Sequence, residues 1–275
     1  MILAINAGNA LVSMGLYHEN RLCAKAVFSN YHETTSDENA YRLRSFVQSA
    51  GYELGSVKGA IISPVNLISS AAIAEAVCAT FGIKALQIGP GIRTGLDILL
   101  KDSTTLGADI VATSVAAIHK YPSPIIVIIV GATALTFSAI NERGQFMGGA
   151  IAPSPKLALS ALCESAAYLP TMPIEAPARI IGADTREAIN SGVVYGAAAT
   201  IRGMAELMVD KITANPHNKG MGSSQGNAAG AKIIITGSVA PAILPYIGIE
   251  VEHDENLLLD GLNILYHRNR RNQAK

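Results

Sequence analysis

Two short turns of small residues are the first candidates for chemistry. One is Asn6-Ala7-Gly8-Asn9 and the other is Gly131-Ala132-Thr133, and each lies between two β-rich runs. Backbone N–H groups in such a turn can hold a phosphate, because glycine lets the anion approach without a Cβ in the way. Any hairpin can contain such a turn, so each one alone is more simply an ordinary chain reversal. Their occurrence at the start of both halves of the chain favours a phosphate site.

Asp109 is the candidate acid for proton transfer. It stands at the start of a helix that we expect over Ala108–His119. A positioned carboxylate can accept the proton of an attacking hydroxyl group. An acid in a first helical turn also stabilises the helix dipole, so the residue types alone leave both roles open.

Composition excludes several classes of protein. The chain has 275 residues, and its 21 Lys and Arg balance 21 Asp and Glu. Zero net charge argues against nucleic acid as a partner, and no polybasic run is present to hold an anionic membrane. The hydrophobic fraction of 49 % argues against disorder. At roughly 150 residues per domain, the length predicts about two domains. Because only 15 % of residues are charged, each acid kept or lost in a motif is informative.

Cysteine and histidine usage points to a reducing, cytoplasmic location. The three cysteines, Cys23, Cys78 and Cys163, are odd in number and widely spaced, which fits neither a disulfide framework nor a zinc knuckle. The six histidines show no metal-ligand spacing. The first residues, MILAIN, place no charged segment before an apolar core, so we expect no secretory signal.

The uncharged stretch Tyr121–Ile140 is long enough to cross a membrane. It contains two prolines, and Gly131 divides it into two β-rich runs, so we expect strands there and no contact with a membrane.

Strand and helix signals alternate in the same order in both halves, which predicts two α/β domains, residues 1–120 and 121–275, around a shared cleft. Residues 215–230 are rich in Gly, Asn and Ser and predict a flexible insert. Strands are expected over Ile2–Ile5, Leu11–Tyr17, Arg21–Phe28, Gly59–Ser63, Lys84–Ile88, Ile125–Val130, Ala134–Ile140, Gln145–Gly148 and Lys232–Thr236. Helices are expected after Thr35 and over Leu67–Phe81, Ala108–His119, Lys156–Tyr168, Thr185–Ile212 and Asn256–Tyr266.

A collinear series of segments resembles the type III pantothenate kinases. GPGIRTGL (Gly89–Leu96) is similar to GPG-x-x-TGL of that family, and LGADIVATSVAAI (Leu106–Ile118) to its GADR-x-x-x-x-x-AA segment. MGGAIAPSPKLALSAL (Met147–Leu162) resembles GGAIAPG-x-x-x-S-x-x-AL. Further matches are AAYLP (Ala166–Pro170), IGADTREAINSGVVYG (Ile181–Gly196) and ITGSVAP (Ile235–Pro241). The resemblance implies a duplicated ribonuclease-H-like α/β fold of the actin, sugar-kinase and heat-shock ATPase type, and a homodimer.

The resemblance also implies an activity. Family members transfer the γ-phosphate of ATP to the primary hydroxyl of pantothenate, on the route to coenzyme A, with Mg²⁺ and with K⁺ or NH₄⁺. By this resemblance Asp109 is the proton acceptor, as such a transfer needs an acid to accept the hydroxyl proton. The same resemblance assigns ATP phosphates to Asn6, Gly8, Asn9 and Thr133, and the substrate to Gly107, Ala108, Ile110 and Thr185.

Several ionic positions of the family motifs are changed here. The acid that organises Mg²⁺ is Asn6, the acid of the monovalent-cation site is Val130, and the arginine of the substrate segment is Ile110. An amide oxygen is a poorer partner than a carboxylate for a hard dication. Ser138 stands where an acid closes the second hairpin, Ala10 and Leu100 replace a threonine and a tyrosine, and Gly237-Ser238 replaces a Gly-Gly pair.

Three functions therefore follow as hypotheses. The chain is a pantothenate kinase with weakened activity or altered cation dependence. Alternatively it is a non-catalytic paralogue that binds ligand or pairs with an intact kinase subunit as a heterodimer. The third hypothesis, motivated by the apolar Ile110, is a kinase for a different hydroxyl substrate that lacks a carboxylate.

Overall fold

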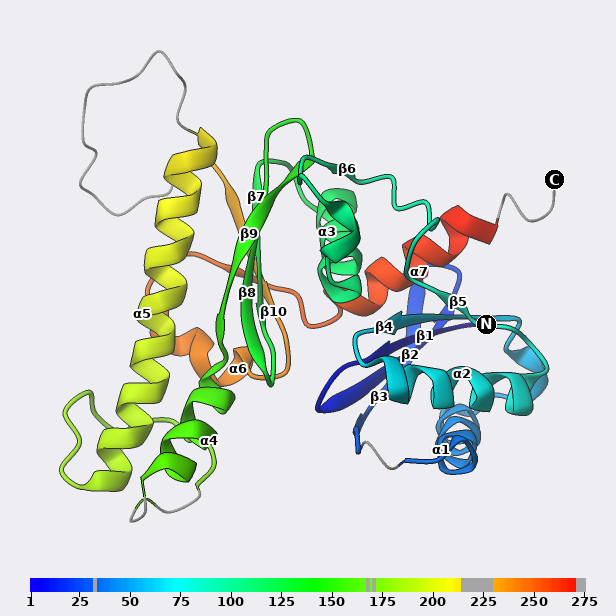
Figure 1. Cartoon of the computed structure of the whole chain (residues 1–275), viewed down its shortest axis with the longest axis horizontal. Coiled ribbons are helices and arrows are strands. Elements are labelled where there is room, and N and C mark those ends of the chain that lie inside the picture. Colours follow the sequence, from blue (N-terminus) through cyan, green and yellow to red (C-terminus); the bar gives the residue numbers. More distant parts are fainter. Residues whose placement is uncertain (32–33, 167–168, 170–171, 214–229, 271–275) are drawn as a thin grey trace. The chain divides into compact units, whose positions relative to one another are not determined.

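The structure is a computed structural model that describes residues 1–31, 34–166, 169, 172–213 and 230–270. Two compact units divide the chain (Figure 1). The first comprises residues 1–96, 101–119 and 256–275, and the second comprises residues 97–100 and 120–255. Each unit has its own sheet and core.

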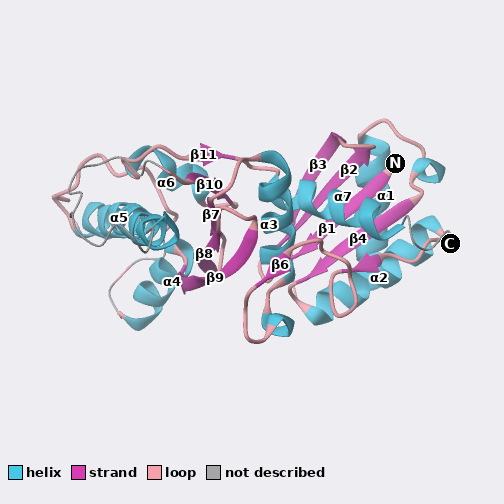
Figure 2. Cartoon of the chain, turned by 90° about the horizontal axis from the view of Figure 1, so that it is seen from above, coloured by secondary structure: helices cyan, strands magenta, loops and turns pink. Residues whose placement is uncertain are grey.

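The first unit is built on a five-stranded sheet in the order β3-β2-β1-β4-β5. Strands β1, β2 and β3 form an antiparallel meander, because short turns join them, whereas β1, β4 and β5 run parallel through helical crossovers. Figure 2 shows β3, β2, β1 and β4 side by side. The strands are β1 (Ile2–Ala7), β2 (Leu11–His18), β3 (Arg21–Ser29), β4 (Gly59–Pro64) and β5 (Leu86–Gln87).

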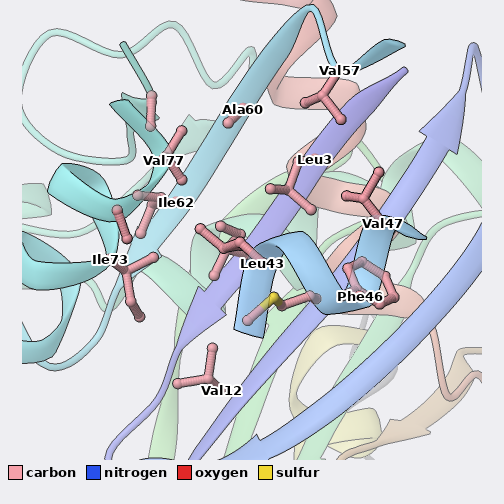
Figure 3. Packing of buried hydrophobic residues seen from close by; sticks show 14 of the residues in the cluster. Leu3, Val12, Leu43, Phe46, Val47, Val57, Ala60, Ile62, Ile73 and Val77 are labelled. Atoms are coloured by element: carbon pink, nitrogen blue, oxygen red, sulfur yellow. The ribbon is translucent and has the colours of Figure 1, made fainter. Parts of the chain in front are cut away.

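Two helices, α1 (Ser36–Ser49) and α2 (Leu67–Phe81), cover one face of this sheet. Helix α1 begins at a capping box formed by Thr35 and Glu38, and α2 is capped by Asn66 and ends at Gly82, which adopts the left-handed conformation. Leu43, Phe46 and Val47 of α1 pack in one cluster with Leu3 and Val12 of the sheet (Figure 3). This apolar core holds β1 and β2 in place, and the first turn joins these two strands.

Helix α7 (Leu257–Arg270) packs against β1, β4 and β2 of the same unit. Helix α3 (Ala108–Lys120) lies beside α7, because Gly261 leaves room for the carbonyl of Ala112, which a Cβ would overlap. Contacts thus place the last helix in the first unit, although it follows the second unit in sequence. A 3₁₀ turn, Ser103–Thr105, precedes α3, and another, Leu54–Ser56, precedes β4.

The second unit is built on a six-stranded sheet in the order β11-β10-β7-β8-β9-β6. Its strands are β7 (Ile125–Val130), β8 (Ala134–Ile140), β9 (Gln145–Pro153), β10 (Lys232–Thr236), β11 (Glu252–His253) and β6 (Asp97–Ile98). β7 and β8 occupy the uncharged stretch that is long enough to cross a membrane, and both are strands there, as expected. No helix in the described part of the chain has the length and apolar character needed to cross a bilayer.

Helices α5 (Thr185–Thr213) and α6 (Ala240–Ile243) pack on one face of this sheet, and α6 continues into a 3₁₀ turn, Leu244–Tyr246. The apolar stripe of α5 meets Ile126, Ile128 and Val130 of β7. Helix α4 (Pro155–Ser165) packs against α5. In Figure 1 the long helix α5 runs beside β8, β9 and β10.

The two units repeat one architecture, as their hydrogen bonds show. Gly8 N–H donates to the carbonyl of Leu11 (3.1 Å), and Gly131 N–H donates to the carbonyl of Ala134 (3.0 Å) in the matching turn. Strand order agrees as well, since β3-β2-β1-β4-β5 corresponds to β9-β8-β7-β10-β11. The duplication expected from the sequence is therefore present, and it extends to the local geometry of the two turns.

Some details differ from the sequence predictions. β9 is longer than predicted, β5 is shorter, and β6, β11 and α6 were not predicted. Helix α4 ends at Ser165, before the predicted end at Tyr168, and neither Tyr168 nor Pro170 belongs to the described residues. The predicted insert also lies outside the described part of the chain, except for Gly230.

Candidate functional site

The first turn joins β1 to β2 and is held in place from two sides. Asn30 donates from Nδ2 to the carbonyl of Gly8 (2.5 Å), and Asn66 N–H donates to the carbonyl of Ala7 (2.9 Å). A Cβ on Gly8 would lie 2.9 Å from the carbonyl oxygen of Leu11, so only glycine fits without a shift. Within the described residues, no hydrogen bond engages the N–H groups of Asn9 and Ala10. These two donors are available to an anion such as a phosphate.

Asn6, the last residue but one of β1, presents a buried Oδ1 without a hydrogen-bond partner in the described structure. Its register partner on β4, Ser63, likewise has a buried Oγ without a described partner. Register partners on adjacent strands face the same side of a sheet. Such groups are costly to leave unsatisfied, so this end of the sheet has unused oxygen atoms that fit a cation or a water molecule.

Asp109 occupies the first turn of α3, where it is half-buried. Its Oδ1 accepts a hydrogen bond from the N–H of Ile110 (2.9 Å). Burial raises the pKa of this carboxyl above its usual value, and the Ile110 N–H partly opposes the rise. Gly107 is tightly placed, because a Cβ there would lie 2.7 Å from Asp109 Oδ1. A carboxylate of raised pKa is a better proton acceptor than an ordinary one.

The residues beside Asp109 lie at or next to the first turn of helix α3. Gly107, Ala108 and Ile110 are all half-buried, and Val111 N–H donates to the carbonyl of Gly107 (3.0 Å) at the start of the helix. Ile110 places an apolar side chain where the family carries an arginine. This segment therefore offers a carboxylate and apolar surface, with no cation next to Asp109 in sequence.

The second turn joins β7 to β8 and is held by Ser154. The Ser154 hydroxyl donates to the carbonyl of Ala132 (2.6 Å), and its oxygen accepts the N–H of Leu157 (3.0 Å) as the N-cap of α4. Ser154 N–H also donates to the carbonyl of Thr133 (3.2 Å). Thr133 itself is exposed at the tip of the turn. Sequence reasoning did not single out Ser154, although Ser followed by Pro155 is a helix-start signal that could have identified it.

Val130 lies at the end of β7 and is fully buried in the apolar cluster of the second unit. Its carbonyl accepts the N–H of Val239 (3.1 Å), and its backbone closely approaches Gly237, which has a φ of +108°. A valine side chain offers no ligand atom. The side chain present at this position therefore does not fit a monovalent cation.

Thr185 begins α5 and is exposed at the lining of a cavity of about 810 Å³ in the second unit. The cavity lies between α4, α5 and the ends of β8 and β9, and it is mainly apolar, with Leu135, Leu162 and Val193 in its wall. Leu135 is two residues after Thr133 on the same hairpin. The second unit thus brings the Thr133 hairpin and Thr185 into one region, whereas Asn6, Gly8, Asn9 and Asp109 belong to the first unit.

Mg²⁺ is the cofactor that the family implies beside ATP. No group of three or more His, Cys, Asp or Glu side chains that could hold a metal ion is present among the described residues. Mg²⁺ is commonly held by few protein groups together with substrate phosphates. The unpartnered Oδ1 of Asn6 fits this role as one neutral oxygen ligand, with the phosphates of ATP supplying the negative charge.

Solved structures define the class of fold. The chain resembles component A of the (R)-2-hydroxyglutaryl-CoA dehydratase of Acidaminococcus fermentans, with a TM-score of 0.57 at 12 % identity over 100 % of this chain and 99 % of that one. It also resembles the ROK hexokinase of Thermus thermophilus, with a TM-score of 0.51 at 12 % identity over 98 % and 99 % of the two chains. The predicted duplicated α/β fold of the actin and sugar-kinase type is confirmed.

The family follows from the sequence comparisons. A sequence model described as type III pantothenate kinase matches residues 2–207. The type III pantothenate kinase of Geobacillus thermodenitrificans is 34 % identical over 269 residues, which cover 98 % of each chain. The chain belongs to the type III pantothenate kinase family.

Proposed function

We propose that the protein transfers the γ-phosphate of ATP to the primary hydroxyl of pantothenate. The observation that carries the proposal is Asp109: a half-buried carboxylate of raised pKa at the start of α3, on the segment that matches the substrate segment of the family. The N–H groups of Asn9 and Ala10 in the first turn, which no described hydrogen bond engages, and Thr133 at the tip of the matching second turn support a nucleotide site. Activity is expected to be weaker than in members that keep the acids replaced by Asn6 and Val130.

In the proposed reaction, Asp109 accepts the proton as the hydroxyl oxygen forms a bond to the γ-phosphorus. The bond from that phosphorus to the β-phosphate oxygen breaks, and ADP leaves. Such a transfer depends mainly on positioning and on charge stabilisation. The backbone N–H groups of the first turn would stabilise phosphate oxygens, and Asn6 would hold Mg²⁺, which neutralises phosphate charge when bound. Gly107, Ala108 and Thr185 would contact the substrate.

The test is an assay of the purified protein with ATP, Mg²⁺ and pantothenate, in the presence of K⁺ or NH₄⁺ and in their absence. Turnover by the protein alone, lost in Asp109→Asn, supports the proposal. Because Val130 offers no ligand, we expect turnover to be independent of K⁺ and NH₄⁺. Turnover that is unchanged in Asp109→Asn refutes the proposed role of this residue.

A second candidate is a non-catalytic partner of an intact kinase subunit. The fully buried Val130 and the apolar Ile110 favour it, since both replace ionic groups of the family. Activity that requires mixing with an intact paralogue would support this role. ATP consumption with neutral alcohols but not with pantothenate would instead support a different hydroxyl substrate.

We also propose that the protein is a cytoplasmic homodimer, and that the apolar cavity beside α4 and α5 is the contact. Leu162 of its wall is 43 % exposed, and Leu157, also on α4, is 42 % exposed, which is unfavourable unless a partner covers them. Gly196 in the same wall has open space around it, so Gly196→Arg should give a monomer by light scattering. Gly203→Arg, on the same helix but not in the cavity wall, is the matched control and should remain a dimer.

A further inference from the structure

A second cavity, of about 610 Å³, lies in the first unit where β4 and β5 begin. It is separate from the first turn of that unit. β1 and β4 pair in parallel from Ile2 opposite Gly59 to Ala7 opposite Pro64. Gly59 lines the cavity, whereas the turn follows Ala7, so the two regions stand at opposite ends of these strands, about 17 Å apart at 3.3 Å per residue.

The wall of this cavity carries positive charge. The exposed side chains of Lys58, Lys84 and Arg270 line it, and none of its described lining residues is acidic. Within the described part of the chain, none of the three side chains forms an ion pair or a hydrogen bond. Three cations along one cavity without a described counter-charge give it a positive potential, which attracts an anion.

The hydroxyl group of a largely buried tyrosine faces the same space. Tyr266 of α7 lines the cavity, is only 8 % exposed, and its hydroxyl has no described hydrogen-bond partner. The hydroxyl lies over Gly59, where any Cβ would overlap it. A glycine at the first residue of β4 thus makes room for a hydroxyl that donates to no described group and is therefore available to a ligand in the cavity.

We propose that this cavity binds a small organic anion with at least two negative charges, such as a phosphoric acid ester. Lys58, Lys84 and Arg270 would donate charge-assisted hydrogen bonds to its oxygens, and the Tyr266 hydroxyl would add a neutral one. The side chains have to provide the attraction, because the cavity meets the C-terminal, negative end of the α7 dipole. The inference goes beyond the proposed kinase activity and does not depend on it.

The probe is inorganic pyrophosphate, titrated into the full chain and followed by the backbone amide signals in nuclear magnetic resonance. The largest shifts are expected at Lys58, Gly59 and residues 83–87. Shifts confined to the turns at Gly8 and Gly131 would mean that pyrophosphate binds only a nucleotide-phosphate site, and would overturn the proposal.

Variants then test the named side chains. Lys58→Gln/Lys84→Gln should weaken binding at the cavity by about tenfold or more, which corresponds to about 1.4 kcal/mol per factor of ten. Tyr266→Phe keeps the ring and should weaken binding by a smaller factor. The matched control, Arg21→Gln/Arg44→Gln, removes two exposed cations of the same unit outside the cavity and should leave the affinity unchanged. Unchanged affinity in the lysine variant, or equal losses in variant and control, would refute the site.

Discussion

Ser154 supports a prediction that links stability to nucleotide binding. This residue is fully buried, and its single hydroxyl group has two tasks: it caps α4 through the N–H of Leu157, and it holds the second turn through the carbonyl of Ala132. Ser154→Ala removes both hydrogen bonds and leaves the backbone of β9 and α4 otherwise intact. The variant should therefore be less stable and should bind ATP less well.

The size of both effects follows from these contacts. Loss of an N-cap costs about 0.5–2 kcal/mol, and loss of the second hydrogen bond about 0.5–1.5 kcal/mol. Together they lower the free energy of unfolding by about 1–3.5 kcal/mol, or the Tm by about 2–7 °C for a chain of this length. If Thr133 contacts ATP, the loosened turn should raise the KM for ATP by about tenfold, because small displacements at a site are costly.

Thr35→Ala is the matched control. Thr35 caps α1 by the same type of hydrogen bond, from Glu38 N–H at 3.2 Å, but it holds no turn of the candidate site. It should lower the Tm and leave the KM for ATP unchanged. Thermal unfolding and initial rates at varied ATP measure both quantities. An unchanged KM in Ser154→Ala, with the Tm lowered as expected, would refute the role of the second turn in nucleotide binding.

Three further predictions concern titratable or ionic positions. Asp109→Asn should lower turnover by about 10²–10⁴-fold. Above about pH 4 the variant should have a higher free energy of unfolding than the native chain, because burial penalises only the ionised carboxylate; at lower pH the two values should converge. Without ligand, Asn6→Asp should lower the free energy of unfolding by about 1–3 kcal/mol, since no described donor faces the buried Oδ1. Mg²⁺ with ATP should restore the Tm of this variant in thermal melts, and its turnover should exceed that of the native chain. Burial and the hydrogen bond to Asp254 raise the pKa of Tyr121 to about 12. The stability that this residue contributes is therefore complete below about pH 10 and is lost towards pH 12. Urea titrations should show that the free energy of unfolding falls less steeply between these pH values in Tyr121→Phe.

Much of the fold is predictable from local sequence signals. β7 and β8 were predicted with their observed bounds, because an uncharged run interrupted by Gly131 allows few alternatives to a hairpin. Helix α2 likewise has its predicted bounds, since Gly82 provides a strong stop. The two-residue strands β6 and β11 carry no periodic pattern, and they exist only because β9 and β10 offer an open edge.

The candidate site was predictable only in part. The turns at Gly8 and Gly131 are visible as small-residue breaks between strands, but their equivalence depends on hydrogen bonds that the sequence does not display. The raised pKa of Asp109 depends on burial in three dimensions. The capping signal of Ser154 could be read from the sequence, but its bond to Ala132 joins residues 22 positions apart and required the fold.

The matching turns explain why the two replaced acids are not equivalent. Gly8 corresponds to Gly131, so Val130 corresponds to Ala7, and both side chains face the apolar core of their own unit. Asn6 is one residue earlier and therefore faces the opposite side of its sheet, where its oxygen is left without a described partner.

Valine at position 130 adds apolar contacts that an acid could not make, so Val130→Asp would place an unpaired charge in the core and should unfold the second unit. Asn6→Asp has no such core to disrupt. Restoration of activity is therefore expected from Asn6→Asp alone, and the pair of substitutions should be worse than the single one.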